Sequence, residues 1–252
     1  MRKVKVAQYS LTCCEGCTIM LLNVIASNPK ILERIEIVSS RILGYPEPVE
    51  ADIAFVDGSI ITQHDLELIK TIREKTNTVI ALGSCACFGG INALRELMKF
   101  NEAARLVYGY FPNMPHIKDV KPIDSTIKVD YFLPGCPPPR HEVEQFIMHL
   151  LLGKIYRLPE RPVCFECKSR GLTCFLDNGI PCLGPITRGG CEAACIKINM
   201  PCWGCRGPID ELRPDVYIEA IKDHKLNLAE IIDKIKIFMY KTKASTILGE
   251  SK

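Results

Sequence analysis

The chain has little excess charge and no long apolar run, and each absence excludes a class of protein. Its 32 Lys and Arg residues nearly balance 29 Asp and Glu residues, for a net charge of +3 without a basic cluster. A nucleic-acid-binding protein would carry such a cluster. No apolar run reaches the roughly 18 residues that a membrane span needs, and no signal peptide or twin-arginine leader is visible. We therefore expect a cytoplasmic protein with no membrane span and no nucleic-acid partner.

Cysteine, in contrast, is abundant, with 14 among 252 residues. In the reducing cytosol, cysteines at this density usually bind metal rather than form disulfides. Eight of them lie between Cys164 and Cys205, with the spacing C-x2-C-x6-C-x7-C-x8-C-x3-C-x6-C-x2-C. This spacing makes two sets of four, each with a C-x2-C pair, and four thiolates are what one cubane iron–sulfur cluster needs. Two four-cysteine zinc sites would follow the same spacing logic, so zinc is the alternative.

Ahead of this segment, predicted strands alternate with predicted helices. The strands, mostly rich in valine, isoleucine and aromatic residues, are predicted at residues 3–10, 35–40, 52–58, 78–83 and 126–133. The helices are predicted at residues 18–27, 63–75, 92–98 and 141–152. This alternation predicts an α/β fold with a doubly wound parallel sheet. Residues 100–125 lack a clear period and are expected to cross the surface, with short helical pieces.

After residue 153 the pattern changes, because Gly, Pro and Cys replace the periodic apolar residues. We expect the fold of this part to be set by metal clusters rather than by an apolar core. A helical pattern returns at residues 215–240. The residues from Thr242 onward are expected to form a loose end.

The remaining cysteines follow three of the predicted strands. They occur in Cys14-Glu15-Gly16-Cys17, in Gly83-Ser84-Cys85 and in Pro134-Gly135-Cys136, with Cys13 and Cys87 beside them. The carboxyl ends of parallel strands share one edge of a sheet, so the three loops should converge there. Two ligands from one loop and one from each of the others make a third set of four. Zinc in the later segment would leave this dispersed set unexplained.

The motifs L-x2-C-x-G-C, G-S-C-A and P-G-C-P-P, in this order, resemble the small subunit of nickel–iron hydrogenases. The later motifs C-L-G-P at 182–185 and C-x-G-C-R-G-P at 202–208 extend the resemblance over nearly the whole chain. The resemblance implies a flavodoxin-like domain at residues 1–155 that carries a proximal cluster. It also implies an irregular cluster-binding domain at residues 156–252, which carries medial and distal clusters and ends in a helix.

The resemblance further implies three 4Fe–4S clusters and their ligands. The proximal ligands would be Cys14, Cys17, Cys85 and Cys136. The medial ligands would be Cys191, Cys195, Cys202 and Cys205. The distal ligands would be Cys164, Cys167, Cys174 and Cys182. The chain would then be an electron-transfer subunit without a catalytic residue of its own, since the nickel site belongs to a separate large subunit.

Two departures narrow the family. Periplasmic members typically have a histidine where this chain has Cys164, and often a proline where it has Cys195. The all-cysteine pattern is similar to the soluble cytoplasmic group. The stretches V-D-Y-x-L-x-G-C-P-P and P-V-C-x-E-C look most like the delta subunit of NAD(P)-linked sulfhydrogenases. The implied partners are the large subunit and diaphorase subunits with flavin and iron–sulfur centres.

Other interpretations remain open at this point. One is the small subunit of a hydrogenase associated with heterodisulfide reductase. Another is a quinone-linked module like that of respiratory complex I, which usually lacks the eight-cysteine segment; the third is a zinc-binding adaptor. Cys13 and Cys87 are surplus thiols, although a swap between Cys13 and its neighbour is conceivable. Glu15 and Asp57, the latter where the family usually has glutamate, have no assigned role.

Overall fold

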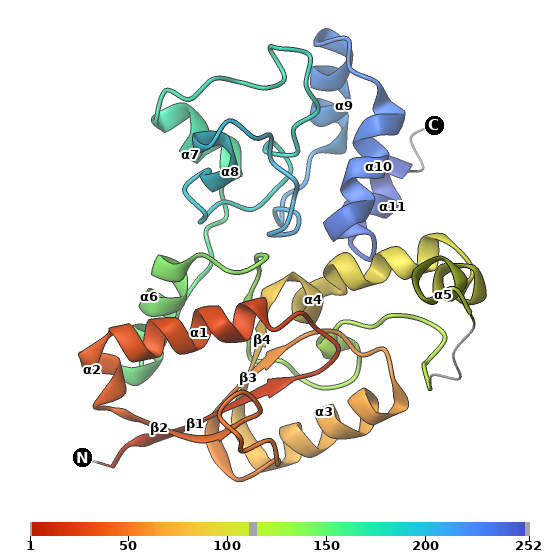
Figure 1. Cartoon of the computed structure of the whole chain (residues 1–252). Coiled ribbons are helices and arrows are strands. Elements are labelled where there is room, and N and C mark those ends of the chain that lie inside the picture. The colour runs from red at the N-terminus through yellow and green to blue at the C-terminus, as the bar shows by residue number, and fades with distance from the viewer. Residues whose placement is uncertain (1, 111–114, 250–252) are drawn as a thin grey trace. The chain divides into compact units, whose positions relative to one another are not determined.

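The computed structural model describes residues 2–110 and 115–249 and divides the chain into two compact units, Met1–Lys154 and Ile155–Lys252 (Figure 1). The first unit is built on strands β1 (Val4–Ser10), β2 (Ile35–Ser40), β3 (Ala51–Asp57), β4 (Thr76–Leu82) and β5 (Tyr131–Leu133). They lie in the order β2-β1-β3-β4-β5, and all neighbours are parallel. This is the flavodoxin-like order of doubly wound sheets, so the predicted fold class is confirmed.

Helices cover both faces of this sheet, with α1 and α6 on one side and α3 on the other (Figure 1). The helices of this unit are α1 (Gly16–Ser27), α2 (Pro29–Leu32), α3 (Gln63–Lys75), α4 (Gly83–Phe88), α5 (Phe100–Tyr108) and α6 (Arg140–Leu151). The described part of this unit also contains two 3₁₀ helices, η1 (Gly90–Leu97) and η2 (Ile123–Ser125). The helix predicted at residues 92–98 is therefore of the 3₁₀ type.

The alternation of side chains along the strands buries apolar residues on both faces of the sheet. On the α3 side, Val56 of β3 belongs to the same buried cluster as Ile69 of α3. On the other side, the ring of Phe146 in α6 meets Phe55 and Tyr131 edge to face, with centroids 6.2 and 5.4 Å apart. Each fully buried side chain of this size contributes about 1.5–3 kcal/mol. This two-sided core holds the strand ends in place.

Strand β5 is shorter than the prediction of residues 126–133. The Asp130 carboxylate accepts a hydrogen bond from the backbone N–H of Val79 at 2.9 Å. It also forms an ion pair with Arg73, whose guanidinium donates to it at 2.7 Å. A side chain thus takes the N–H that a longer parallel pairing with β4 would have used. The ladder begins only at Tyr131, which pairs with Ile80.

The second unit contains five helices in its described part: α7 (Val163–Ser169), α8 (Ala194–Lys197), α9 (Pro214–Asp223), α10 (Leu228–Met239) and α11 (Lys243–Gly249). The expectation that this part lacks an apolar core is wrong. Its buried cluster includes Leu183, Ile186, Ala193, Ile196, Tyr217, Ile221, Ile231, Ile235 and Met239. Five of its cysteines also belong to this cluster or pack against it: Cys167, Cys174, Cys182, Cys191 and Cys202.

Two further expectations need correction here. The helical pattern predicted over residues 215–240 is broken at residues 224–227, where Asn227 caps α10 by accepting a hydrogen bond from the Ala229 N–H at 2.9 Å. The supposed loose end forms α11, because Ala244 and Leu248 are completely buried. Across the described residues, every helix is too short or too polar to cross a membrane.

Candidate metal centres at the cysteines

Three loops at the carboxyl edge of the sheet bring four cysteines of the first unit together. They are Cys14 and Cys17 after β1, Cys85 after β4 and Cys136 after β5. Cys17 is buried, whereas Cys14 and Cys136 are exposed. After burial, proximity to Cys136 and Cys85 is among the causes that raise the pKa of Cys17, and proximity to Cys14 is among those that raise the pKa of Cys136. The structure therefore places all four predicted proximal ligands in one site.

Glycines let the backbone approach these sulfurs closely. Gly83, at the start of α4, has φ +86°, and a Cβ on it would overlap the sulfur of Cys17. A Cβ on Gly16 would lie 3.4 Å from the sulfur of Cys14. Residues without side chains thus leave the sulfurs room to face a common centre.

Burial works against charge on these thiols. It is the largest cause that raises the pKa of Cys17, and the neighbouring Asp57 carboxylate acts in the same direction. Burial and Asp57 together raise the pKa of Cys85 to about 11. Because the thiolate is the metal-binding form, a bound cationic centre is what would hold these sulfurs ionised. Metal binding at this site would therefore be coupled to the release of protons from these thiols.

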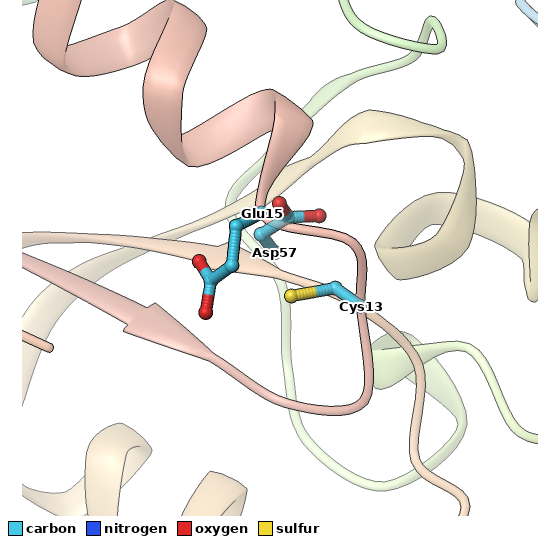
Figure 2. A group of neighbouring side chains, drawn as sticks. All are labelled: Cys13, Glu15 and Asp57. Atoms are coloured by element: carbon cyan, nitrogen blue, oxygen red, sulfur yellow. The ribbon is translucent and has the colours of Figure 1, made fainter. Parts of the chain in front are cut away.

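Cys13 lies with two carboxylates beside this site. Figure 2 shows Cys13 and Glu15 on the loop after β1 and Asp57 at the end of β3. One potential ligand atom from each lies within 4.8 Å of the others. Glu15 accepts a hydrogen bond from Ser10 at 2.6 Å and pairs with Arg41. In the sequence, the signals for this group were the Cys13-Cys14 pair and the acidic residue before Gly58. These signals did not show that the three side chains lie together.

Asp57 occupies the middle of the site for a topological reason. Strand β3 lies between β1 and β4, so its last residue falls between the loops that carry Cys17 and Cys85. Asp57 is 2% exposed, and burial raises the pKa of its carboxyl group. The Thr18 hydroxyl lies 3.5 Å from it. The other surplus thiol, Cys87, lies apart from this group and donates to the Ala81 carbonyl at 3.4 Å.

In the second unit, the four predicted distal ligands line one pocket. They are Cys164, Cys167, Cys174 and Cys182. Gly184 also lines the pocket, and a Cβ on it would lie 3.1 Å from the sulfur of Cys164. Burial is the largest cause that raises the pKa of Cys164 to about 12, followed by the charges of the other three cysteines.

The predicted medial ligands adjoin this pocket. The charge of Cys191 acts on Cys195, and that of Cys205 acts on Cys202. The charge of Cys182, which belongs to the distal set, is also among the causes that raise the pKa of Cys195 and of Cys202. The backbone N–H of Cys202 donates to the sulfur of Cys182 at 3.3 Å. The two sets are therefore joined by a direct hydrogen bond to sulfur.

Buried polar residues support these cysteines, and the sequence reasoning missed them. Tyr217 donates its hydroxyl to the Cys182 carbonyl at 3.0 Å. Arg206 is 1% exposed and donates to the Gly189 carbonyl at 2.8 Å. Glu166 is 4% exposed, and its Oε1 accepts a hydrogen bond from Gly190 at 2.6 Å. In the sequence, the signal for Glu166 and Arg206 was their position inside the cysteine motifs C-x-E-C and C-R-G-P.

The spacing of the sulfurs bears on the kind of metal centre. Within residues 2–110 and 115–249, Cys13, Glu15 and Asp57 are the one group of three or more potential ligand atoms that lie within 4.8 Å of one another. The sulfurs of each predicted quartet are therefore farther apart than the ligand atoms of this group. A tetrahedral zinc ion with Zn–S bonds of about 2.3 Å would draw its sulfurs to about 3.8 Å apart. The quartets fit a larger, polynuclear centre better.

Comparison with known proteins places the chain in a family. Residues 14–150 match the family described as NADH ubiquinone oxidoreductase, 20 Kd subunit. One subunit of the F420-non-reducing hydrogenase vhu of Methanocaldococcus jannaschii is 37% identical over 82% of this chain and 83% of its own length. The sulfhydrogenase 2 subunit delta of Pyrococcus furiosus is 36% identical over 93% of this chain and 99% of its own length.

A solved structure adds to these relatives. A chain of an NAD+-reducing [NiFe]-hydrogenase in the H2-reduced state superposes with a TM-score of 0.57 and 28% identity, over 63% of this chain and 96% of that one. The resemblance drawn from the cysteine motifs is thus confirmed, and so is the prediction of a subunit of an oxidoreductase complex. The chain belongs to the NADH ubiquinone oxidoreductase 20 Kd subunit family and, within it, to the iron–sulfur small subunits of nickel–iron hydrogenases.

Proposed function

We propose that this chain relays electrons between a hydrogen-activating nickel–iron site in a large subunit and a diaphorase partner that reduces NAD(P). The observation that supports the proposal is that the four predicted distal cysteines line one pocket and that the predicted proximal cysteines lie on neighbouring loops at one edge of the sheet, with glycines against the sulfurs of both sets. Four thiolates per quartet match what a 4Fe–4S cluster requires.

The residues of the chain divide the work among three sites. Cys14, Cys17, Cys85 and Cys136 would hold the proximal cluster; Cys191, Cys195, Cys202 and Cys205 the medial one; and Cys164, Cys167, Cys174 and Cys182 the distal one. When bound, each cluster would accept and release one electron at a time. The protein tunes that exchange through thiolate ligation, hydrogen bonds to sulfur and burial. The Cys202 N–H bond to the Cys182 sulfur is one such hydrogen bond.

Exposure at the sheet edge supports a large partner subunit there. Cys14 and Cys136 are exposed, and the apolar side chains of Ile19 and Ile91, which follow Cys17 and Cys85 in sequence, are 51% and 46% exposed. A cluster held by such loops needs shielding from water and oxygen. A permanent subunit interface supplies that shielding and would also cover the apolar side chains.

The proposal also specifies which partner accepts the electrons. The relative named sulfhydrogenase and the relative named F420-non-reducing hydrogenase both match most of this chain. The chain from the NAD+-reducing enzyme matches 63% of it, about the share taken by the first compact unit. A diaphorase partner agrees with the structure of the NAD+-reducing enzyme. A heterodisulfide reductase partner is the alternative, and the subunits that co-purify distinguish the two.

Replacement of Cys17 by serine tests the proposed route. Cys17 is the most buried of the four proximal cysteines, and its loss removes one of four thiolates. We expect Cys17→Ser in the purified complex to abolish hydrogen-dependent dye reduction and to leave NAD(P)H-dependent dye reduction intact. The substitution would interrupt electron transfer between the nickel site and the medial and distal clusters. The diaphorase subunits would be unchanged.

The matched control is Cys87→Ser, which removes a cysteine that donates to the Ala81 carbonyl and lies outside the quartet. It should keep both activities. Hydrogen-dependent activity near the wild-type rate in Cys17→Ser, with the proximal cluster absent from the spectrum, would rule out the route.

A further inference from the structure

One lysine of the second unit lies against both of its cysteine quartets. Lys234, in α10, donates from Nζ to the Pro181 carbonyl at 2.6 Å. The same ammonium lies 4.2 Å from the centroid of the Trp203 ring. Pro181 directly precedes Cys182 of the distal quartet, and Trp203 directly follows Cys202 of the medial quartet. The two contacts thus hold the ammonium beside residues that adjoin one ligand of each set.

The charges around Lys234 support this placement. Cys182, Cys202 and Cys195, which come from both quartets, are near enough that their charges, when ionised, raise the pKa of Lys234. Partial burial lowers the pKa of Lys234, and these thiolates act in the opposite direction. Asp233, its neighbour in the helix, is paired with Lys236 at 2.7 Å on the exposed side.

We propose that the positive charge of Lys234 raises the reduction potentials of the medial and distal clusters together. This inference rests on the proposed function, which places clusters in both quartets. Reduction adds a negative charge to a cluster, so a fixed cation nearby stabilises the reduced form. The interaction is stronger at a partly buried site than in water, because the surroundings are less polarisable.

The surroundings of Lys234 keep this charge in one position. An ammonium is attracted to the face of a tryptophan ring, and the hydrogen bond to Pro181 sets its direction. A flexible surface lysine would spread its charge over many positions and would be screened by salt. Lys234 therefore acts as a positioned charge, held by the Pro181 carbonyl and the Trp203 ring.

Redox titration of the purified complex, followed by electron paramagnetic resonance, tests the inference. We expect Lys234→Gln to make reduction of both clusters of the second unit harder by on the order of tenfold, equivalent to about 59 mV for a one-electron couple. Lys234→Arg keeps the charge and should keep the midpoint potentials near those of the wild type. Glutamine and arginine both keep an N–H donor, so the two variants differ in the charge that they carry.

Lys236→Gln is the matched control, since it removes the same charge from the exposed side of the same helix. Its midpoint potentials should stay near those of the wild type. Midpoints that move equally in Lys234→Gln and Lys236→Gln, or in neither, would overturn the role of Lys234 while leaving the clusters in place. Absence of both cluster signals from the wild-type complex would instead overturn the proposed function, and this inference with it.

Discussion

Gly83 shows how one residue without a side chain shapes the proximal site. Its φ of +86° lies in a region that L side chains rarely adopt, and a Cβ would overlap the sulfur of Cys17. Gly83 thus allows the backbone to turn into α4 and also leaves room for the sulfur of Cys17. The motif G-S-C-A indicated a close approach, but only the structure identifies Cys17 as the group approached.

Gly83→Ala should therefore disturb the proximal quartet selectively. Displacement of the Cys17 sulfur would weaken ligation, so we expect a loss of about four iron atoms per chain. Gly44→Ala is the matched control, because Gly44 has the same φ of +86° and no heavy atom within 4 Å of the added Cβ. Iron analysis of both variants separates backbone strain from the contact with sulfur. Equal iron contents in the two variants would contradict this account of Gly83.

Cys195 carries a second prediction at this scale. Cys195→Pro removes one of the four medial thiolates and leaves one iron without a protein ligand. We expect a three-iron cluster, seen as a new signal in the electron paramagnetic resonance spectrum of the oxidised protein. Cys13→Ser, which alters a cysteine outside the three quartets, should give no such signal. A spectrum of Cys195→Pro that matches the wild type would mean that Cys195 is not a ligand.

Among the elements, those with a strong period could be predicted best from the sequence. The helix expected at residues 63–75 and the strand expected at 35–40 have the bounds of α3 and β2. The strand at 126–133 was overestimated because the Asp130 side chain replaces a backbone partner. The positions of Asp57 and Lys234 could not be predicted, since each depends on which elements become neighbours in space.

Helix α11 is the element that the sequence reasoning missed most clearly. Its seven residues are too few to form a stable isolated helix, so no local signal predicted it. Burial of Ala244 and Leu248 in the core of the second unit is what holds it. The same core contains Cys182 and Cys202, so α11 supports the part of the chain that would carry two clusters.

Leu248→Ala should accordingly destabilise the second unit by about 2–5 kcal/mol, as expected for a fully buried leucine. The measurement is the temperature at which the visible iron–sulfur absorbance is lost under anaerobic heating. Ile247→Ala, at a neighbouring residue that is 38% exposed, should lower this temperature much less. If the two variants lose their absorbance at the same temperature as the wild type, α11 does not support the cluster-binding part.

In the molecule as a whole, the two units hold different sets of cysteines. The first unit gathers four cysteines at a sheet edge where two of them remain exposed. The second unit has eight cysteines, five of them in or against a small apolar core, and it also buries Glu166 and Arg206. The sequence alone predicted the grouping of these cysteines, because their spacing and their positions after strands are visible in it. The buried charges and the bond between Cys202 and Cys182 required the structure.

The central claim is that all three quartets hold four-iron clusters. The most direct measurement is the content of iron, acid-labile sulfide and zinc, per copy of this chain, in its complex with the large subunit purified without oxygen. This complex is first separated from the diaphorase subunits, whose own iron–sulfur centres would otherwise be counted. We predict about twelve acid-labile sulfides, and about twelve iron atoms beyond those that accompany nickel. About four sulfides with two zinc ions, or zinc in place of iron throughout, would contradict the account.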